Sequence, residues 1–305
     1  MSLDTRPATG HADPQRTAEL LRDLDEENST AVRRWSATLD LDHDDPYLFD
    51  HPLDHVPGMA LICGVFQLVR ATGTPVEGID RRIRTTLRFP LFCELERTIR
   101  VAAADTGGPE GALTVRAEQA GTAVCTGHVE FGAVEAPAVR RPTARLLPAE
   151  TPAAEPALVH RRLAQNVLIS EMVPTGADQT VAVRRPFAGH PLASPPGEPD
   201  QVELVIDAAR QYATMINHVA HHASPDLRFV LLDLDADLPG TVHGDVELSW
   251  TPIPPAKGRR SLVFDVLVDG VRRGHVGFRY YAAPEAVYQR LRHPATPATN
   301  QEGHK

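Results

Sequence analysis

The sequence predicts an α+β protein built from two related halves in tandem, each with an antiparallel sheet curved around one central helix. Three observations support this fold class. The chain has 305 residues, which suits two domains of about 150 residues each. A hairpin pattern occurs twice, once near the end of each half, and one helical segment lies upstream of each hairpin.

The repeated hairpin is the clearest sign of duplication. LTVRAEQAGTAVCTGHVEF at 113–131 aligns with LVFDVLVDGVRRGHVGF at 262–278 if the turn differs by two residues. Each segment begins as an alternating strand, passes a turn glycine, Gly121 or Gly270, and returns through Gly-His-Val. Because self-similarity at this spacing marks a repeated unit, we expect both halves to end in the same hairpin.

The helical segments also correspond. They read MALICGVFQLVRA in the first half and QVELVIDAARQYATMINHVAHH in the second, where Asp200 is placed to cap the helix. Aligning CGVFQ with DAARQ puts Cys63 opposite Asp207 and Gln67 opposite Gln211. The first segment is apolar on nearly all sides, as a helix enclosed by a curved sheet would be.

Composition changes along the chain suggest the domain boundaries. Residues 1–28 are polar and are expected to form a loose arm or a short surface helix. The first repeat is assigned to 29–135 and the second to 158–288. A Pro- and Ala-rich linker at 136–157 separates them, since proline discourages both helix and sheet. Residues 289–305 are expected to be a tail.

Composition also restricts the function classes. A formal charge of −9 argues against a nucleic-acid partner, which requires a basic face. No apolar run approaches the ~18 residues of a membrane span, and the N-terminus lacks a signal pattern, so we expect a soluble, cytoplasmic protein without a membrane partner. The three cysteines, Cys63, Cys93 and Cys125, lack metal-site spacing and are expected to be reduced.

The run DHPLDHVPGM at 50–59 resembles the signature of the A-factor biosynthesis (AfsA-like) hotdog family. The second half resembles the other repeat of that family in Val159-His160, NVLIS, VAVRRPFAGHP and IDAARQ. In that family the repeat with Val-His usually comes first, so this chain is identified as a divergent member with its repeats in reversed order. The resemblance spans about 45–285 and implies a tandem double hotdog, with each curved sheet wrapped around a central helix.

The helix after the signature departs from the family pattern. A glutamate is expected there, but this chain has Cys63, and Phe66 replaces an arginine. Only the second half keeps an acid and a base, Asp207 and Arg210. We therefore expect one of two possible sites to be degenerate, with Cys63 and Gln67 as its remnants. Cys63 on an apolar helix is more simply a small buried hydrophobe than a nucleophile.

The resemblance implies chemistry on a β-ketoacyl thioester, carried by acyl carrier protein or coenzyme A. Family members condense such a thioester with a small phosphorylated acceptor, in signal or secondary-metabolite biosynthesis. The same helix resembles that of hotdog dehydratases, so a dehydratase or thioesterase is the alternative, and a non-catalytic acyl-binding protein is a third possibility. A homodimer is compatible with the sequence. No phosphate loop or dinucleotide fingerprint is present, so no cofactor is expected.

The catalytic candidates are Asp207, His55 and His51. Asp207 lies in an apolar stretch of helix, where burial would raise its pKa and suit it to proton transfer. The alternative is a surface acid that pairs with Arg210 three residues later. The resemblance implies a site between the halves, so Asp207 is expected to face His51 or His55. A turn histidine can act as a base, or can simply hold the turn.

The substrate-binding candidates surround the same site. Gly58 and Met59 begin the first helix, where free N–H groups and the helix dipole suit a carbonyl oxygen, although Gly58 can equally belong to an entry turn. Arg210 is a partner for a phosphate of the acceptor. Gln211 is expected to bond backbone near the site. His190 corresponds to the signature histidines and is expected to face the degenerate site.

Three histidines near the end of the second helix have spacing that would suit a metal. They are His218, His221 and His222. Without a carboxylate at fixed spacing, a solvated helix end explains them better, and no metal site is assigned.

Overall fold

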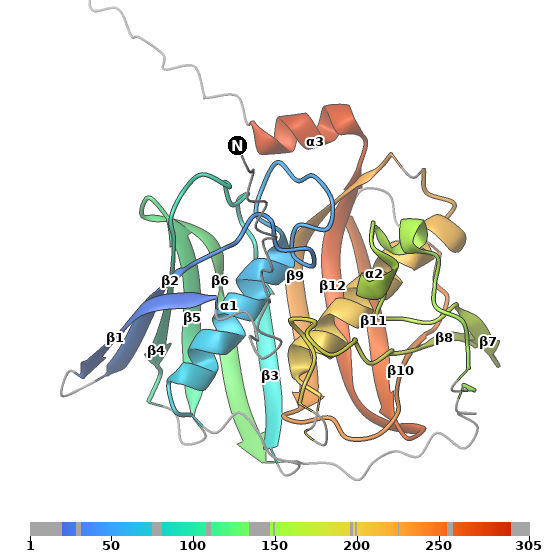
Figure 1. Cartoon of the computed structure of the whole chain (residues 1–305), viewed down its shortest axis with the longest axis horizontal. Coiled ribbons are helices and arrows are strands. Elements are labelled where there is room, and N and C mark those ends of the chain that lie inside the picture. The colour runs from blue at the N-terminus through green and yellow to red at the C-terminus, as the bar shows by residue number, and fades with distance from the viewer. Residues whose placement is uncertain are drawn as a thin grey trace, which may run out of the picture.

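The computed structural model describes residues 20–28, 32–74, 81–107, 111–133, 147–148, 150–195, 198, 200–224, 226–254 and 259–293. In these residues twelve strands form one antiparallel sheet that runs through both halves, with the order β1-β2-β4-β5-β6-β3-β9-β12-β11-β10-β8-β7 (Figure 1). Six strands belong to each half, and β3 pairs with β9 where the halves meet. The predicted tandem double hotdog is confirmed, with its two sheets joined edge to edge.

The strands of the first half are β1 (Leu21–Asn28), β2 (Arg33–Leu39), β3 (Arg81–Arg88), β4 (Ile99–Asp105), β5 (Ala112–Gln119) and β6 (Thr122–Ala133). Those of the second half are β7 (Val173–Thr175), β8 (Asp178–Ala182), β9 (Arg228–Pro239), β10 (Val246–Trp250), β11 (Arg259–Val268) and β12 (Val271–Ala283). The helices are α1 (Gly58–Ala71), α2 (Val202–Val219) and α3 (Glu285–Arg292), with short 3₁₀ turns η1 (Pro156–Val159) and η2 (Ala164–Asn166).

Both predicted hairpins form. The β5–β6 turn contains Ala120 and Gly121 at φ 49° and 76°, and the β11–β12 turn contains Asp269 and Gly270 at φ 50° and 70°. Two successive residues with positive φ make the tight turn whose twist matches that of antiparallel strands. The turn glycines identified in the sequence therefore mark the hairpin tips.

The glycine of each Gly-His-Val sequence has a packing reason. A Cβ on Gly127 would lie 1.9 Å from the carbonyl oxygen of Thr86, and a Cβ on Gly274 would lie 2.0 Å from that of Asp237. Both oxygens belong to the neighbouring strand, β3 or β9. Because backbone cannot move aside as a flexible side chain can, only glycine fits at these two equivalent positions.

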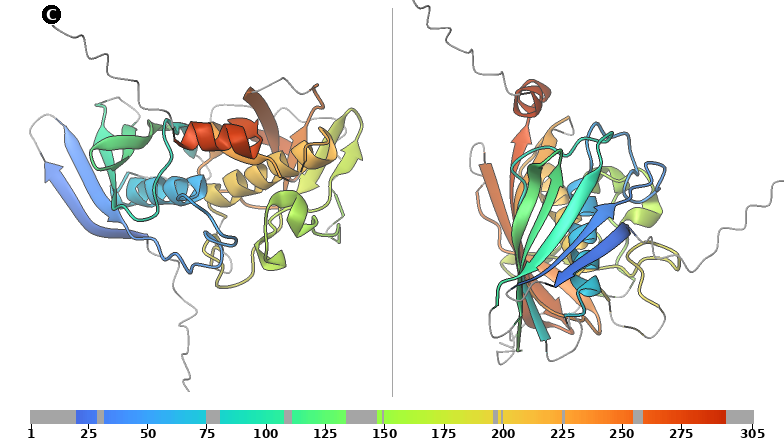
Figure 2. Two further views of the ribbon diagram at one scale, coloured as in Figure 1. Left: turned by 90° about the horizontal axis from the view of Figure 1, so that it is seen from above. Right: turned by 90° about the vertical axis from the view of Figure 1, so that its left-hand side faces the viewer.

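Helices α1 and α2 lie on the same face of the sheet and fill the concave side of each half (Figures 1 and 2). Ten of the fourteen residues of α1 are buried, which explains its lack of a polar face. Arg70 of α1 and the buried Glu203 of α2 join the helices through an ion pair of 2.5 Å. The expected cap is absent, since α2 begins after Gln201 without a side-chain cap, and Asp200 instead forms a β-bridge with Val242.

Opposite charges line the junction between the halves. On the sheet face away from the helices, Arg82 of β3 pairs with Asp237 of β9, and Arg88 lies 3.7 Å from Asp233. Asp233 also forms an ion pair with Arg279 of β12, with 2.7 Å between Oδ2 and Nη2. Cross-strand pairs of opposite charge stabilise this register, since a one-residue slip would turn the charged side chains toward the helices.

Three boundary predictions need correction. Residues 21–28, assigned to the N-terminal arm, form β1 and pair with β2, and their mostly charged and exposed side chains are typical of an edge strand. Ala153, assigned to the linker, already bridges Ser170 of the second half. Helix α3 continues to Arg292, beyond the predicted end of the second repeat. Residues 1–19, 134–146 and 294–305 lie outside the described residues.

No helix in the described ranges is long and apolar enough to cross a membrane.

We predict that Gly127→Ala and Gly274→Ala each lower the free energy of unfolding by about 3 kcal/mol or more, because the new methyl group meets a fixed backbone oxygen. Gly277→Ala is the matched control on the same strand as Gly274, since its Cβ would approach nothing closer than 3.4 Å. Urea unfolding followed by circular dichroism measures the difference. A Gly127→Ala protein as stable as the Gly277→Ala protein would contradict the prediction.

Candidate functional site

Asp207 is the centre of a buried polar cluster where the two halves meet. Its side chain is fully buried, and its carboxylate accepts hydrogen bonds from Arg161 Nη2 at 2.8 Å, Arg210 Nε at 2.6 Å and Gln211 Nε2 at 3.0 Å. Burial by itself raises the pKa of this carboxyl, but Arg210 and Arg161 outweigh it and hold the pKa well below the ordinary value of 3.8. The expected rise in the pKa of Asp207 is therefore wrong.

Arg161 connects the signature loop of the first half to helix α2 of the second. Its guanidinium donates to the carbonyl oxygen of Tyr47 at 2.8 Å, stacks over the Tyr47 ring at 4.7 Å and lies 3.9 Å from Asp50. The Asp50 carboxylate in turn accepts hydrogen bonds from the backbone N–H groups of Arg162 and Leu163, both at 3.0 Å. The first aspartate of the signature thus holds the segment that carries Arg161.

His51 lies beside this cluster. Burial lowers the pKa of His51, Asp50 acts in the opposite sense, and the charges of Arg161, Arg210 and Arg228 lower it further. Its Nδ1 is buried and makes no hydrogen bond to the described residues. The lowered pKa favours a neutral imidazole at His51, on which the charges of Arg161 and Arg210 act.

His55, the second signature histidine, lies elsewhere. Its Nδ1 is 2.7 Å from Asp54 and 3.1 Å from the hydroxyl of Tyr288 on α3, and its ring meets Phe92 edge-on at 5.1 Å. Tyr288 also donates to Asp54 at 2.6 Å. These contacts fasten α3 to the signature loop, so the structure brings His51 but not His55 to the cluster.

A pair of histidines completes the site. His160 Nε2 and His218 Nε2 are 2.8 Å apart, and His218 Nδ1 is 3.1 Å from the carbonyl oxygen of Ala223. A carbonyl only accepts, so His218 Nδ1 carries a proton, and in a neutral His218 the Nε2 then accepts from His160 Nε2. His160 Nδ1 is left as an unprotonated acceptor. Burial first, and then His218 and Arg210, lower the pKa of His160 to about 4, which keeps it neutral at pH 7.

Strand β9 brings the start of α1 toward this histidine pair. The His160 ring packs 5.1 Å from Phe229, and a Cβ on Gly58 would lie 3.1 Å from Leu231, two residues along the strand. Residues two apart in a strand lie about 7 Å apart on the same face. Gly58 and Met59 are the first residues of α1, whose N–H groups have no partner within the helix. The predicted donors therefore lie on the side of β9 that carries Phe229, the contact of the His160 ring.

His190 and Cys63 are buried between the halves. His190 Nδ1 accepts from Leu192 N–H at 3.1 Å, its ring meets Tyr47 at 4.5 Å, and burial lowers its pKa to about 4. Burial raises the pKa of the Cys63 thiol well above its ordinary value. Cys63, Tyr47 and Leu192 line one cavity of about 20 Å³, room for about one water molecule. Cys63 is thus a protonated core thiol.

The two aligned glutamines have the same structural task. Gln211 Oε1 accepts from Leu168 N–H, and Gln67 Oε1 accepts from Leu20 N–H, both at 2.9 Å. Each therefore ties the backbone of an incoming segment to its helix. This common role supports the repeat alignment and explains why glutamine remains in the half that lacks the acid.

Sequence reasoning did not select His160, Arg161 or Tyr47 as site residues. The sequence carried one signal, the Val159-His160 pair of the family resemblance. Nothing local marks Arg161 or Tyr47, because their partners lie 46 and 114 residues away along the chain. Among the described residues, no group of three or more metal-ligating side chains converges.

Comparisons with known proteins agree with this architecture. The dehydratase domain of RzxB from Pseudomonas fluorescens aligns with a TM-score of 0.58 at 12% identity, over 87% of this chain and 99% of that one. The acyl-CoA thioesterase II TesB2 of Mycobacterium marinum aligns with a TM-score of 0.54 at 13% identity, over 87% and 98%. At such identities the likeness establishes the fold, that of a double hotdog protein.

Sequence comparison then gives the family. The family model described as the A-factor biosynthesis hotdog domain matches residues 20–135 and 144–253. The chain therefore belongs to the A-factor biosynthesis hotdog family, as its signature predicted. A search of curated protein sequences finds no match.

We predict that Asp207→Asn lowers the free energy of unfolding at pH 7 by about 3 to 5 kcal/mol, because it removes the closer of the two carboxylates beside the buried Arg161, the one at 2.8 Å, and leaves Asp50 at 3.9 Å. The folded-state pKa of Asp207 is depressed, so its contribution is fully present above the ordinary value of 3.8 and is lost as the pH falls below it. The difference between wild type and variant should therefore narrow below pH 4.

Asp265→Asn is the control for this measurement, since it removes an ion pair with a half-exposed Arg272 and should cost less than about 1 kcal/mol. Urea unfolding at pH 7 and pH 3.5 separates the two variants. Equal stability of wild type and Asp207→Asn at pH 7 would refute the structural role of this carboxylate.

Proposed function

We propose that this protein is an enzyme that acts on a β-ketoacyl thioester of acyl carrier protein or coenzyme A, and condenses its acyl group with a small hydroxyl-bearing acceptor. One observation carries the proposal. In the neutral His160–His218 pair, His160 presents an unprotonated Nδ1, its tautomer is set by His218, and the charge of Arg210 acts on its ring. Membership in the A-factor biosynthesis hotdog family supports thioester chemistry.

The arrangement suggests a sequence of proton movements. His160 Nδ1 accepts the proton of the acceptor hydroxyl as its oxygen attacks the thioester carbonyl carbon. The N–H groups of Gly58 and Met59, at the positive end of the α1 dipole, stabilise the developing oxyanion. The C–S bond then breaks, and the departing thiolate takes the proton from His160. The His160–His218 hydrogen bond holds the ring in place throughout.

Asp207 acts in this proposal as a positioning residue. Its carboxylate is ionised and already accepts three hydrogen bonds from side chains, so it is poorly suited to remove a proton. Instead it orients Arg210, whose Nε donates to it while the Arg210 side chain remains 28% exposed. The positive charge of Arg210 at this point favours an anionic group on the acceptor, which Arg210 would bind through its remaining N–H groups.

Arg184, which precedes Pro186 in the VAVRRPFAGHP segment, is a second arginine that could bind an acceptor phosphate, but it is a weaker candidate. Its guanidinium makes a 3.4 Å contact with the carbonyl oxygen of Thr151, and none of its described contacts involves the Asp207 cluster. Arg210 is therefore the residue proposed to bind the acceptor.

A dehydratase or thioesterase is the second candidate, because proteins with those names share the fold. Either reaction would use the same histidines without a second organic substrate. Incubation with a β-ketoacyl, a β-hydroxyacyl and a saturated acyl thioester, with and without a phosphorylated triol, separates the candidates by the mass of the product. An acyl adduct formed only with the acceptor supports condensation.

We predict that His160→Gln lowers kcat by about 10²- to 10⁴-fold with little change in KM, since it removes the proton acceptor and keeps the approximate shape. His218→Phe should lower kcat less, because it removes only the hydrogen bond that orients His160. Their combination should be little worse than His160→Gln, because the two act as a unit.

His55→Gln is the matched control, since His55 contacts α3 and is expected to retain near-wild-type turnover. Cys63→Ser should also leave turnover nearly unchanged. More than about half of the wild-type rate in His160→Gln, or a large loss in His55→Gln, would discard the assignment. Binding of the thioester without any turnover would favour an acyl-binding protein instead.

A further inference from the structure

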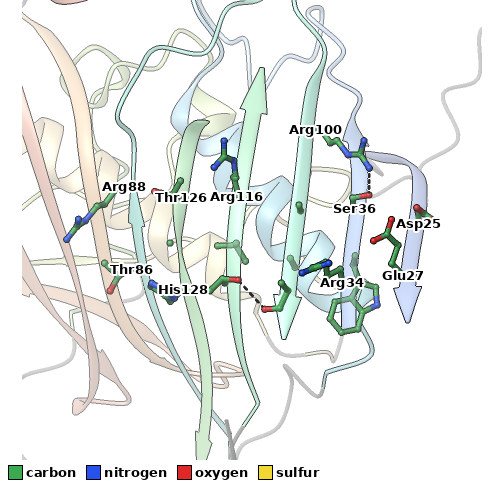
Figure 3. Close-up of a pocket in the computed structure, with 17 residues that line it drawn as sticks. Asp25, Glu27, Arg34, Ser36, Thr86, Arg88, Arg100, Arg116, Thr126 and His128 are labelled. Atoms are coloured by element: carbon green, nitrogen blue, oxygen red, sulfur yellow. Dashed lines mark hydrogen bonds between the residues drawn. The ribbon is translucent and has the colours of Figure 1, made fainter. Parts of the chain in front are cut away.

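A hollow of about 690 Å³ lies on the face of the sheet away from α1 and α2, over the strands of the first half (Figure 3). The sheet separates it from Asp207 and the histidine pair. Its volume falls in the range of small-molecule sites, about 300–1,000 Å³. The proposed thioester chemistry makes no use of it.

Short side chains form the floor of the hollow. In one cross-strand row Ala102 lies between Ser36 and Arg116, and in the next row Ala104 lies beside Thr114. Thr126 continues the first row on β6. Because alanine, serine and threonine rise little above the sheet, the longer arginines around them enclose a depression with several hydroxyl groups.

The walls are basic, although the whole chain is acidic. Four arginines and two carboxylates give the lining a formal charge of +2 (4 − 2), against −9 for the chain. The charged side chains are Arg34, Arg88, Arg100 and Arg116, with Asp25 and Glu27 on the β1 rim. Arg88 and Arg116 remain 73% and 48% exposed beside their ion-pair partners. An arginine has five N–H donors, so these pairs leave donors for a ligand.

The spacing of the arginines suits two anionic groups. Arg116 and Arg88 lie in one row on either side of Thr126, two strand intervals or about 10 Å apart. Arg100 is diagonal to Arg116 on the adjacent strand, at about 7–8 Å. One phosphate between Arg100 and Arg116 and a second at Arg88 would span the hydroxyl-lined floor.

The second half does not repeat this surface. There His275 faces Asp265, where the equivalent His128 faces Thr114. Asp265 binds Arg272 at 2.7 Å and neutralises it. The basic hollow is therefore particular to the first half and does not follow from the duplication.

We propose that this hollow is a binding site for a small molecule with two separated phosphate groups joined by a polar, hydroxyl-bearing core. Guanidinium groups bind the phosphates in bidentate fashion. The floor hydroxyls and the carboxylates of Asp25 and Glu27 bind the core. A ligand with a single phosphate engages only one end of the site.

Isothermal titration calorimetry of the full chain with fructose 1,6-bisphosphate and fructose 6-phosphate tests this site. The bisphosphate should bind at least about tenfold more tightly than the monophosphate. Arg88→Ala and Arg116→Ala should each remove that advantage. Arg272→Ala, an outer-face arginine of the second half, is the control and should keep it. Unchanged urea midpoints confirm that the variants are folded.

Equal affinity for the two sugar phosphates, no binding of either, or an equal loss in Arg272→Ala would overturn the proposal. Light scattering tests whether this face instead joins two copies of the chain. The proposal is also overturned if wild type binds no bisphosphate and the mass in solution falls in the Arg88→Ala/Arg116→Ala double variant. The hollow would then be an interface between copies of the chain. Thioester turnover is measured separately, so neither result depends on the proposed catalytic function.

Discussion

The pairing of β3 with β9 is the constraint on which the rest of the molecule depends. It joins two hotdog halves into one sheet, and its arginines on β3 face aspartates on β9. A symmetric pair of identical subunits would place like residues at equivalent positions across such a junction. A fused repeat can diverge, and here the two junction strands carry opposite charges. The pairing of β3 with β9 thereby fixes both the strand register and the relative position of α1 and α2.

That relative position creates the buried cluster. Asp207 and Arg210 come from α2, Asp50 and His51 from the loop before α1, and Arg161 from the segment that enters the second half. The cluster is asymmetric, since Cys63 in α1 is an apolar counterpart of Asp207. Duplication thus preserved the backbone frame, including Gly127 and Gly274, while the polar chemistry remained in only one of the two equivalent places.

The fate of each candidate residue depends on the distance to its partners along the chain. Sequence reasoning found Asp207 as an acid on a helix, but it inferred a raised pKa from apolar neighbours, and the arginines reverse that shift. The two signature histidines are indistinguishable by local pattern. Only the position of α3 separates them, because Tyr288 holds His55 away from the cluster.

The sequence by itself determined the duplication, the hairpin turns, the two central helices and the family, because these depend on local periodicity, turn glycines and a contiguous signature. The tertiary structure alone decided that residues 21–28 form an edge strand, that Asp207 is ionised, and that His160 is oriented by His218. Those outcomes depend on groups brought together from distant segments. Burial and charge at such a meeting point are set by the partners, and the local sequence does not contain them.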